Sequence, residues 1–354
     1  MAIFFARKLL KWHLENPRLL PWGDEERNPY HIWLSEIIMQ QTRIEQGAKY
    51  YHGLINAFPT LEDLAAATSD EVMRQWQGLG YYTRARNLHK AAKHIVQNLN
   101  GLFPDSYSGL LDLPGIGPYS AAAIASFAFG HRHVVVDGNV KRVIARFAGI
   151  HTSIDDAWTH KTILELATTY MKDVSPAIFN QAIMNFGALV CKPKLALCSI
   201  CPLSTRCYAF QNHMVYELPL RSKKKLNRVR HFHFILLCYR GKILLHRRDQ
   251  KDIWQGLFVP PIIETASSKT PSVKGLHSFV LSLVGHNSFE ERKSFLPVTQ
   301  QLSHQTIIGR FVLLQLNSTP GKLSTDFVWA NKKTLQDFAK PKMVADFVKL
   351  NGVL

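Results

Sequence analysis

Four of the five cysteines in the chain lie close together in the segment CKPKLALCSICPLSTRC. They are Cys191, Cys198, Cys201 and Cys207, in the spacing C-x6-C-x2-C-x5-C. Four thiolates in one short segment can close around a single metal centre, which is either a structural zinc or an iron–sulfur cluster. Disulfide bonds are the alternative, but only Cys238 lies outside the group and the N-terminal sequence is not that of a signal peptide.

A glutamate in the segment PYHIWLSEIIMQQTRIEQ is the first candidate for acid–base chemistry. The segment, residues 29–46, has the pattern of an amphipathic helix. Helical spacing favours Glu36 on a solvent-exposed stripe with Gln40 and Arg43. The alternative is that the surrounding isoleucines, tryptophan and methionine bury Glu36, raise its pKa and allow it to deliver a proton near neutral pH.

A second carboxylate, Asp137, follows the apolar run HVVV and begins the segment DGNVKRVIARFAG. An aspartate directly before a helix is usually an N-cap, and a helix N-terminus favours its ionised form. Together, Glu36 and Asp137 would form one protonated and one charged carboxyl group, as in enzymes that break glycosidic bonds. Lys141 and Arg142 follow on the same helix and either meet phosphates or are ordinary solvated charges.

A glycine-containing turn precedes an alanine-rich helix in LPGIGPYSAAAIASFAFG. Gly115 and Gly117 allow a tight turn with bare backbone N–H groups, and Pro118 suits the first turn of the helix that follows. Such N–H groups beside a helix N-terminus can bind a phosphate without a charged side chain. A simple connection between two helices is the alternative for the same pattern.

Length and charge limit the class of protein and its partners. With 354 residues, the chain is expected to form two domains. Its net charge of +17 predicts a polyanionic partner, most commonly nucleic acid. No segment approaches the roughly 20 apolar residues of a membrane span, so we expect no membrane partner and a cytoplasmic location, in the nucleoid if the source is bacterial.

The hydrophobic pattern changes once along the chain. Residues 1–212 have apolar residues at three- and four-residue spacing and are predicted to be helical, with the cysteine loop 191–207 at their end. Residues 213–230 are polar and basic and are predicted to form a linker. Residues 231–354 are predicted to form an α+β domain, with a hairpin around Arg240-Gly241 and a final helix that Pro341 kinks or splits.

Several motifs in residues 1–210 occur in the order of a known family. They are WLSEIIMQQT, GLGYYTRARNLHKAA, LPGIGPYSAAAIASFAFG, VVVDGNVKRV, FNQAIMNFGALVC and the cysteine loop. This half resembles the A/G-specific adenine DNA glycosylase (MutY) family of the endonuclease III superfamily, whose members excise adenine mispaired with 8-oxoguanine or guanine. The resemblance implies a multidomain, monomeric protein: an all-α helix–hairpin–helix glycosylase domain with one [4Fe–4S] cluster, and an α+β Nudix-like domain that recognises 8-oxoguanine.

The resemblance also implies roles for individual residues. Glu36 falls on the glutamate that protonates adenine, Asp137 on the aspartate that stabilises the cationic sugar, and Asn139 on an asparagine that assists it. Tyr119 stands where strand-cleaving members carry a lysine, which implies base excision without lyase chemistry. The position matches further imply substrate contacts at Arg18, Trp22, Gln41 and Tyr81, phosphate contacts at Gly115, Gly117, Lys141 and Arg142, and metal ligation at Cys191, Cys198, Cys201 and Cys207.

The second half resembles the family less closely. Ser303 and His304, in TQQLSHQTI, match residues that read 8-oxoguanine, although Leu302 replaces a frequent phenylalanine. Asn185 replaces a frequent acidic residue of the adenine pocket, and Gly23 replaces a frequent polar one. SFEERKSF is not the acidic box of a Nudix hydrolase, so we do not expect nucleotide hydrolysis.

Two other functions fit parts of this pattern. A related glycosylase that removes thymine from a G·T mismatch would share the helical half and the cysteine loop, but it would generally lack the second domain. A non-catalytic lesion-binding protein would not need both Glu36 and Asp137. The combined features therefore favour a double-stranded DNA partner that carries A·8-oxoguanine or A·G mispairs.

Overall fold

The computed structural model describes residues 1–18, 27–222, 227–286 and 288–352. No helix within these ranges is long and apolar enough to cross a membrane.

The chain divides into two compact units, each of which is described by itself. The first unit combines Met1–Ala66 with Asn87–Lys224, and the second combines Ala67–Arg86 with Lys225–Leu354. The second unit thus includes a helical segment from within residues 1–212, the range that the sequence predicts as one helical domain.

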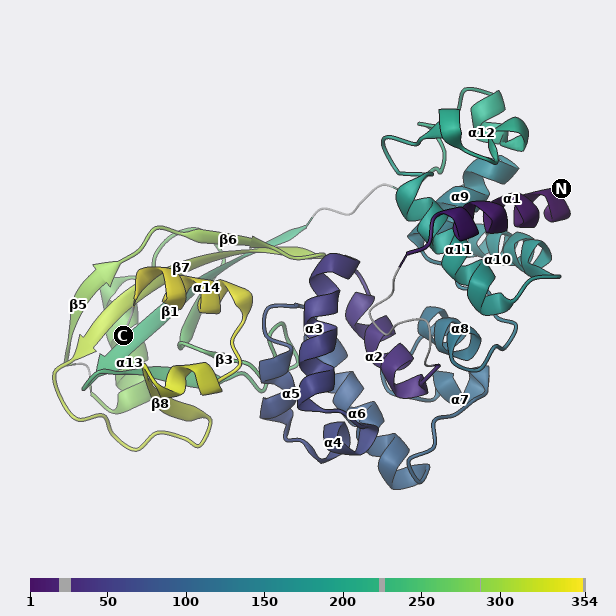
Figure 1. Cartoon of the computed structure of the whole chain (residues 1–354). Coiled ribbons are helices and arrows are strands. Elements are labelled where there is room, and N and C mark those ends of the chain that lie inside the picture. Colours follow the sequence, from purple (N-terminus) through teal and green to yellow (C-terminus); the bar gives the residue numbers. More distant parts are fainter. Residues whose placement is uncertain (19–26, 223–226, 287, 353–354) are drawn as a thin grey trace. The chain divides into compact units, whose positions relative to one another are not determined.

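The first unit is built from helices and lacks strands in its described part. Figure 1 shows these helices, which are α1 (Ala2–Glu15), α2 (Pro29–Met39), α3 (Ile44–Ala57), α4 (Leu61–Ala66), most of α6 (Thr83–Asn98), α7 (Tyr107–Leu111), α8 (Pro118–Phe127), α9 (Gly138–Ala148), α10 (Ala157–Met171), α11 (Pro176–Leu189) and α12 (Tyr208–Gln211). Two 3₁₀ turns, η1 (Cys198–Ile200) and η2 (Ser204–Arg206), lie in the cysteine loop.

The main core of this unit lies between α1, α9, α10 and α11. Phe5 of α1 stacks on Tyr170 of α10, with ring centroids 4.6 Å apart, and meets Phe147 of α9 edge-on. Each fully buried side chain of this size stabilises the fold by about 1.5–3 kcal/mol. This core holds the N-terminus of α9, where Asp137 lies, against α11.

Helix α2 is shorter than the sequence predicts. Asn28 caps its N-terminus by accepting a hydrogen bond from the Tyr30 N–H, and Pro29 occupies the first turn. The prediction of one helix over residues 29–46 is wrong, because α2 ends at Met39 and Gln41 adopts a left-handed backbone with φ of 56°. This break starts the separate helix α3 at Ile44.

The predicted helix–turn–helix around the two glycines is confirmed as α7, a tight turn and α8. Leu113 and Ile116 are buried and anchor the turn. At Gly115, φ is +81° and a Cβ would lie 2.6 Å from Cβ of Asn87, so only glycine fits. All residues of α8 from Ser120 to Phe127 are buried, as expected for a helix of small residues that packs closely.

The second unit contains one mixed sheet, in which the described residues form eight strands. The strands are β1 (Arg228–Tyr239), β2 (Lys242–Arg247), β3 (Phe258–Val259), β4 (Ile262–Thr265), β5 (Phe289–Ser294), β6 (Val298–Gln301), β7 (Gln305–Leu316) and β8 (Phe327–Asn331). The order is β3-β2-β1-β7-β5, with β4 also paired to β1, β6 to β7 and β8 to β2.

The predicted hairpin is confirmed, because β1 and β2 pair antiparallel around Arg240-Gly241. Both turn residues have positive φ, 46° and 69°, as two-residue hairpin loops require. TIIGRFVLLQL is one strand, β7, which runs parallel to β1 over eleven residue pairs.

Helices cover both faces of this sheet (Figure 1). Helix α13 (Val273–Val284) packs on Ile235 and Leu237 of β1. Helix α14 (Lys342–Asn351) covers the opposite face, where Phe347 stacks on Phe311 at 3.6 Å. The predicted split at Pro341 is confirmed, since Pro341 precedes α14 and the 3₁₀ turn η3 (Thr334–Asp337) ends before it.

Residues 213–230, predicted as a linker, contribute to both units. Val215 and Leu218 are buried in the first unit, whereas β1 begins at Arg228 in the second. Arg230 is 7% exposed and forms paired hydrogen bonds with both Asp252 and Glu264. Arg230, at the end of this segment, therefore has a structural position within the second unit.

The segment 67–86, with α5 (Ser69–Gln75), is joined to the second unit by hydrogen bonds. The Lys340 N–H donates to Oε1 of Gln77 at 2.8 Å, and Arg86 donates to the Gln255 carbonyl at 2.7 Å. The partners in each of these hydrogen bonds are far apart in sequence, so no local pattern reveals that this segment belongs to the second unit.

Candidate active site

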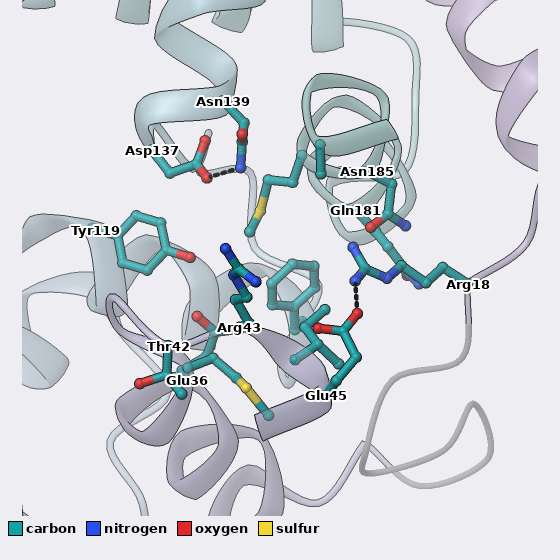
Figure 2. Close-up of a pocket in the computed structure, with 15 residues that line it drawn as sticks. Arg18, Glu36, Thr42, Arg43, Glu45, Tyr119, Asp137, Asn139, Gln181 and Asn185 are labelled. Atoms are coloured by element: carbon teal, nitrogen blue, oxygen red, sulfur yellow. Dashed lines mark hydrogen bonds and ion pairs between the residues drawn. The ribbon is translucent and has the colours of Figure 1, made fainter. Parts of the chain in front are cut away.

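A cavity of about 330 Å³ in the first unit brings both candidate carboxylates together. Figure 2 shows Glu36, Tyr119, Asp137 and Asn139 on one part of its wall and Asn185 with Gln181 across from Tyr119. The lining residues are Arg18, Glu36, Met39, Thr42, Arg43, Ile44, Glu45, Tyr119, Phe127, Asp137, Asn139, Gln181, Met184, Asn185 and Ala188. Arg18 follows α1, and the others come from α2, the α2–α3 junction, the start of α3, α8, the start of α9, and α11.

Glu36 is buried, with 5% of its surface exposed. The favoured interpretation, a solvent-exposed stripe with Gln40 and Arg43, is therefore wrong. Burial raises the pKa of Glu36 to about 7, the negative charge of Asp137 adds to this rise, and a hydrogen bond from the Tyr119 hydroxyl opposes it. Glu36 is thus protonated in a large fraction of molecules at neutral pH.

Asp137 is the N-cap of α9, as its position before a helix predicts. One carboxylate oxygen accepts from the Val140 N–H at 2.7 Å and the other from Nδ2 of Asn139 at 2.8 Å. Burial raises the pKa of Asp137, and these donors together with Arg142 oppose the rise. The helix N-terminus stabilises the Asp137 anion as expected. Burial has the larger effect, so the net shift of the Asp137 pKa is upward.

The two carboxyl groups therefore differ in their hydrogen-bond donors. The Tyr119 hydroxyl donates to Glu36, whereas Asp137 receives backbone donors at a helix N-terminus and the Asn139 amide. Donors aimed at a carboxylate favour its charged form. Glu36 can therefore supply a proton to a molecule in the cavity, while Asp137 carries a negative charge on the wall of the same cavity.

Arg142 is a structural residue in the first unit. It is 5% exposed and makes four hydrogen bonds: to the carbonyls of Gly138, Gly187 and Cys191, and to Oδ1 of Asn139. The prediction that Arg142 contacts phosphate is wrong, because its donors are occupied inside the protein. Arg142 instead holds the Asn139 amide so that Nδ2 points at Asp137.

The remaining candidate phosphate contacts lie on or near the surface. Lys141 donates to the Ile154 carbonyl at 2.8 Å, which engages one of its three N–H groups. Gly117 is the N-cap of α8 without a side-chain cap, and a Cβ there would meet no atom within 4 Å. The N-terminus of α8 therefore has open space beside it that a phosphate could occupy.

The four cysteines lie around one loop and are partly buried as free thiols. The pKa of Cys201 is raised to about 12, mainly by burial and further by the negative charges of Cys191, Cys198 and Cys207, so the four sulfurs share one neighbourhood. Across the described residues, however, no three His, Cys, Asp or Glu side chains are arranged to hold a metal ion. The donor chemistry fits a thiolate-ligated centre, whereas the metal centre itself stays a prediction.

Arg146 ties this loop to α9. Its guanidinium donates to the carbonyls of Lys192, Pro193 and Leu218, and to Sγ of Cys191 at 3.4 Å. A cation beside the sulfurs favours thiolate over thiol. The loop thus supplies thiols and a compensating positive charge from the same helix that begins at Asp137.

Two predicted substrate contacts in the first unit lie at the cavity or near it. Arg18 lines the cavity and pairs with Glu45 at 3.3 Å. Gln41 is exposed in the α2–α3 turn. Its positive φ costs of order 1–3 kcal/mol and keeps the side chain at the tip of the turn. Trp22 and Gly23 lie outside the described residues.

The second unit brings Tyr81 and Ser303 together, since their hydroxyl groups form a hydrogen bond. Tyr81 is 48% exposed and also has a positive φ, 48°. Ser303 and His304 are exposed in the tight turn between β6 and β7, which the Leu302 N–H closes onto the Gln305 carbonyl. This turn presents polar groups beside an exposed aromatic ring.

Sequence reasoning missed several residues of the site. Gly187 lets α11 approach α9, because a Cβ there would lie 2.6 Å from Cβ of Asn139. Figure 2 shows Arg43, at the N-terminus of α3, with its guanidinium in the cavity. Gln181 lines it from α11, and its position four residues before Asn185 in an otherwise largely apolar helix was the available signal.

Two family matches cover different parts of the chain. Residues 34–168 match the HhH-GPD superfamily of base excision DNA repair proteins, and residues 232–350 match the NUDIX domain. These matches confirm the predicted multidomain fold of a helical glycosylase region followed by a Nudix-like region.

Relatives with established names match over most of the chain. Adenine DNA glycosylase of Buchnera aphidicola subsp. Schizaphis graminum is 30% identical over 354 residues, covering 99% of each chain. The enzyme of that name from Buchnera aphidicola subsp. Baizongia pistaciae is 36% identical over 73% of this chain and 74% of its own. The Homo sapiens adenine DNA glycosylase is 41% identical over 58% of this chain and 39% of its own.

Solved structures resemble the helical part. A thermostable thymine-DNA glycosylase is 29% identical with a TM-score of 0.55, covering 60% of this chain and 97% of that one. Endonuclease III in a non-covalent DNA complex is 26% identical with a TM-score of 0.51, covering 60% of this chain and 95% of that one.

Proposed function

Because the chain belongs to the adenine DNA glycosylase family, we propose that it excises adenine mispaired with 8-oxoguanine or guanine from duplex DNA and does not cleave the strand. The observation that carries this proposal is a buried glutamic acid with a pKa of about 7 that shares a cavity with Asp137. Cleavage of a glycosidic bond needs such an acid and such an anion.

The substrate base must leave the duplex to reach this cavity. Extrusion costs a few kcal/mol of unstacking, least at a mispair. The open backbone at Gly117 and the N-terminus of α8 would hold a phosphate beside the site. The exposed Gln41 is suited to fill the vacated stack, because its backbone conformation holds it at the tip of a turn.

Glu36 is the general acid of the proposed reaction. Its proton goes to N7 of adenine, so the base leaves as a neutral molecule when the bond from N9 to C1′ breaks. A positioned acid of matched pKa typically contributes 10²–10⁴-fold, or about 3–5 kcal/mol. The Tyr119 hydroxyl lies on the same cavity wall and, as a hydrogen-bond donor to Glu36, opposes the rise of its pKa.

Asp137 stabilises the oxocarbenium-like sugar that remains. Its negative charge lies on the cavity wall, and Asn139 and Arg142 hold its orientation. Water then completes an abasic site. Tyr119 supplies no amine, so a Schiff base with C1′, the route to strand cleavage, cannot form at this position.

Recognition of the opposite base is assigned to the second unit. Ser303, His304 and Tyr81 form an exposed polar and aromatic surface there, and the Ser303 hydroxyl bonds to the Tyr81 hydroxyl. Hydrogen-bonding groups of this kind can distinguish 8-oxoguanine from guanine by the groups on its edge. A duplex with these mispairs is therefore the proposed partner, bound by a monomer in the cytoplasm.

The cysteine loop would hold one [4Fe–4S] cluster through Cys191, Cys198, Cys201 and Cys207. When bound, the cluster would serve as a structural cross-link of the loop. Arg146 would offset the charge of the thiolates and fix the loop to α9. The loop's Lys192 and Lys194 would then face DNA phosphates.

One assay tests the proposed function. Matched duplexes with A opposite 8-oxoguanine, G, C or T, and a G·T duplex, are incubated with the purified protein and then treated with alkali. We expect breaks at adenine opposite 8-oxoguanine and G only, and none without alkali. Breaks at thymine in G·T would favour the thymine-specific alternative, and intact mispaired adenine would refute the proposal.

A further inference from the structure

Asn185 of α11 carries a hydrogen-bond donor without a partner in the cavity. The residue is 5% exposed, and its Nδ2 has no hydrogen-bond partner within the described part of the chain. A buried amide N–H without an acceptor costs about 1–3 kcal/mol. Such a group in a ligand cavity is explained when the ligand supplies the acceptor.

Polar residues such as Gln181 and Thr42 also line the cavity, but none of them accepts a hydrogen bond from Asn185 Nδ2. Other residues that line the cavity, Met184, Ala188, Phe127 and Ile44, are apolar. The carboxylate of Glu45 is paired with Arg18. A molecule that enters the cavity can therefore supply the missing acceptor.

This inference rests on the proposed function, in which the positions of the two carboxyl groups fix the orientation of the extruded adenine. N7 of adenine faces Glu36 and C1′ faces Asp137, so the five-membered ring lies on that side. Figure 2 shows Asn185 across the cavity from Tyr119, the residue that binds Glu36. The six-membered ring consequently points toward Asn185, with N1 as its farthest acceptor.

We infer that Asn185 is a specificity-determining residue whose Nδ2 donates a hydrogen bond to N1 of the extruded adenine. Guanine carries an N1–H donor at the same place, so two donors would oppose each other in its complex. A site that leaves buried polar groups unpaired rejects the wrong base strongly. The neutral amide thus gives this chain a donor where an ionised acidic residue would offer only acceptors.

The test compares adenine with 1-deazaadenine, which keeps N7 but lacks the N1 acceptor. Single-turnover excision of both bases opposite 8-oxoguanine is measured for the wild type and for Asn185→Leu. The ratio of the adenine rate to the 1-deazaadenine rate should fall about tenfold in the variant, the usual effect of one lost hydrogen bond to a buried group. Intrinsic differences between the two bases cancel in this comparison.

Two further variants separate the hydrogen bond from packing. Met184→Leu alters the neighbouring apolar wall and should leave the ratio at its wild-type value. Asn185→Ala removes the donor without adding bulk, so it should reproduce the fall if leucine disturbs the fold. An unchanged ratio in both Asn185 variants overturns the inference, whereas a wild-type enzyme that leaves adenine intact overturns the proposed function itself.

Discussion

Replacing Glu36 with glutamine should abolish excision and, at the same time, stabilise the protein above neutral pH. Burial raises the pKa of Glu36 from 4.5 to about 7, so the folded protein holds a proton that the unfolded chain releases between these pH values. The contribution of the Glu36 carboxyl group to the free energy of unfolding is fully present below pH 4.5 and is lost as the pH rises through 7. At 1.36 kcal/mol per pH unit, the loss is about 3 kcal/mol.

Urea unfolding of the wild type and Glu36→Gln at pH 5 and pH 8 measures this effect. Glutamine carries no charge at either pH. The free energy of unfolding of the variant minus that of the wild type should therefore be about 2–3 kcal/mol larger at pH 8 than at pH 5. Glu165→Gln, at an exposed position, is the control and should follow the wild type. A difference between wild type and Glu36→Gln that is the same at both pH values would refute a raised pKa of Glu36 in the folded protein.

Three other predictions follow from the contacts of α9. Gly187→Ala would place a Cβ 2.6 Å from Cβ of Asn139, so excision should fall at least about tenfold, and a rate equal to wild type would contradict this role of the glycine. Arg142→Lys cannot make the four hydrogen bonds of the guanidinium and should lower the free energy of unfolding by about 2–3 kcal/mol in urea titrations, with no change in the salt dependence of DNA binding. Removal of iron by a chelator should loosen the loop that Arg146 holds, seen as faster backbone hydrogen exchange at 191–207; unchanged exchange would exclude a structural cluster.

Local features of the sequence were sufficient for much of the fold. The Arg240-Gly241 turn, the split at Pro341 and the N-cap at Asp137 depend on residues within a few positions, and all three are present. Local reasoning failed at Gln41, where the chain leaves the helical region although Ile44 resumes the helical spacing of Ile37. It also could not assign 67–86 to the second unit, because the contacts involved are distant in sequence.

The candidate site divides in the same way. Residue types and spacing alone identified Cys191 to Cys207 as a group, and Glu36 and Asp137 as a pair of carboxylates. Only the tertiary structure decided that Glu36 is buried, because helical periodicity puts a residue on one side of its own helix without saying what covers that side. Helices α3 and α8 pack on α2, and burial among them raises the pKa of Glu36. The carbonyls of Gly187 and Cys191 likewise make Arg142 an internal support in place of an expected surface charge.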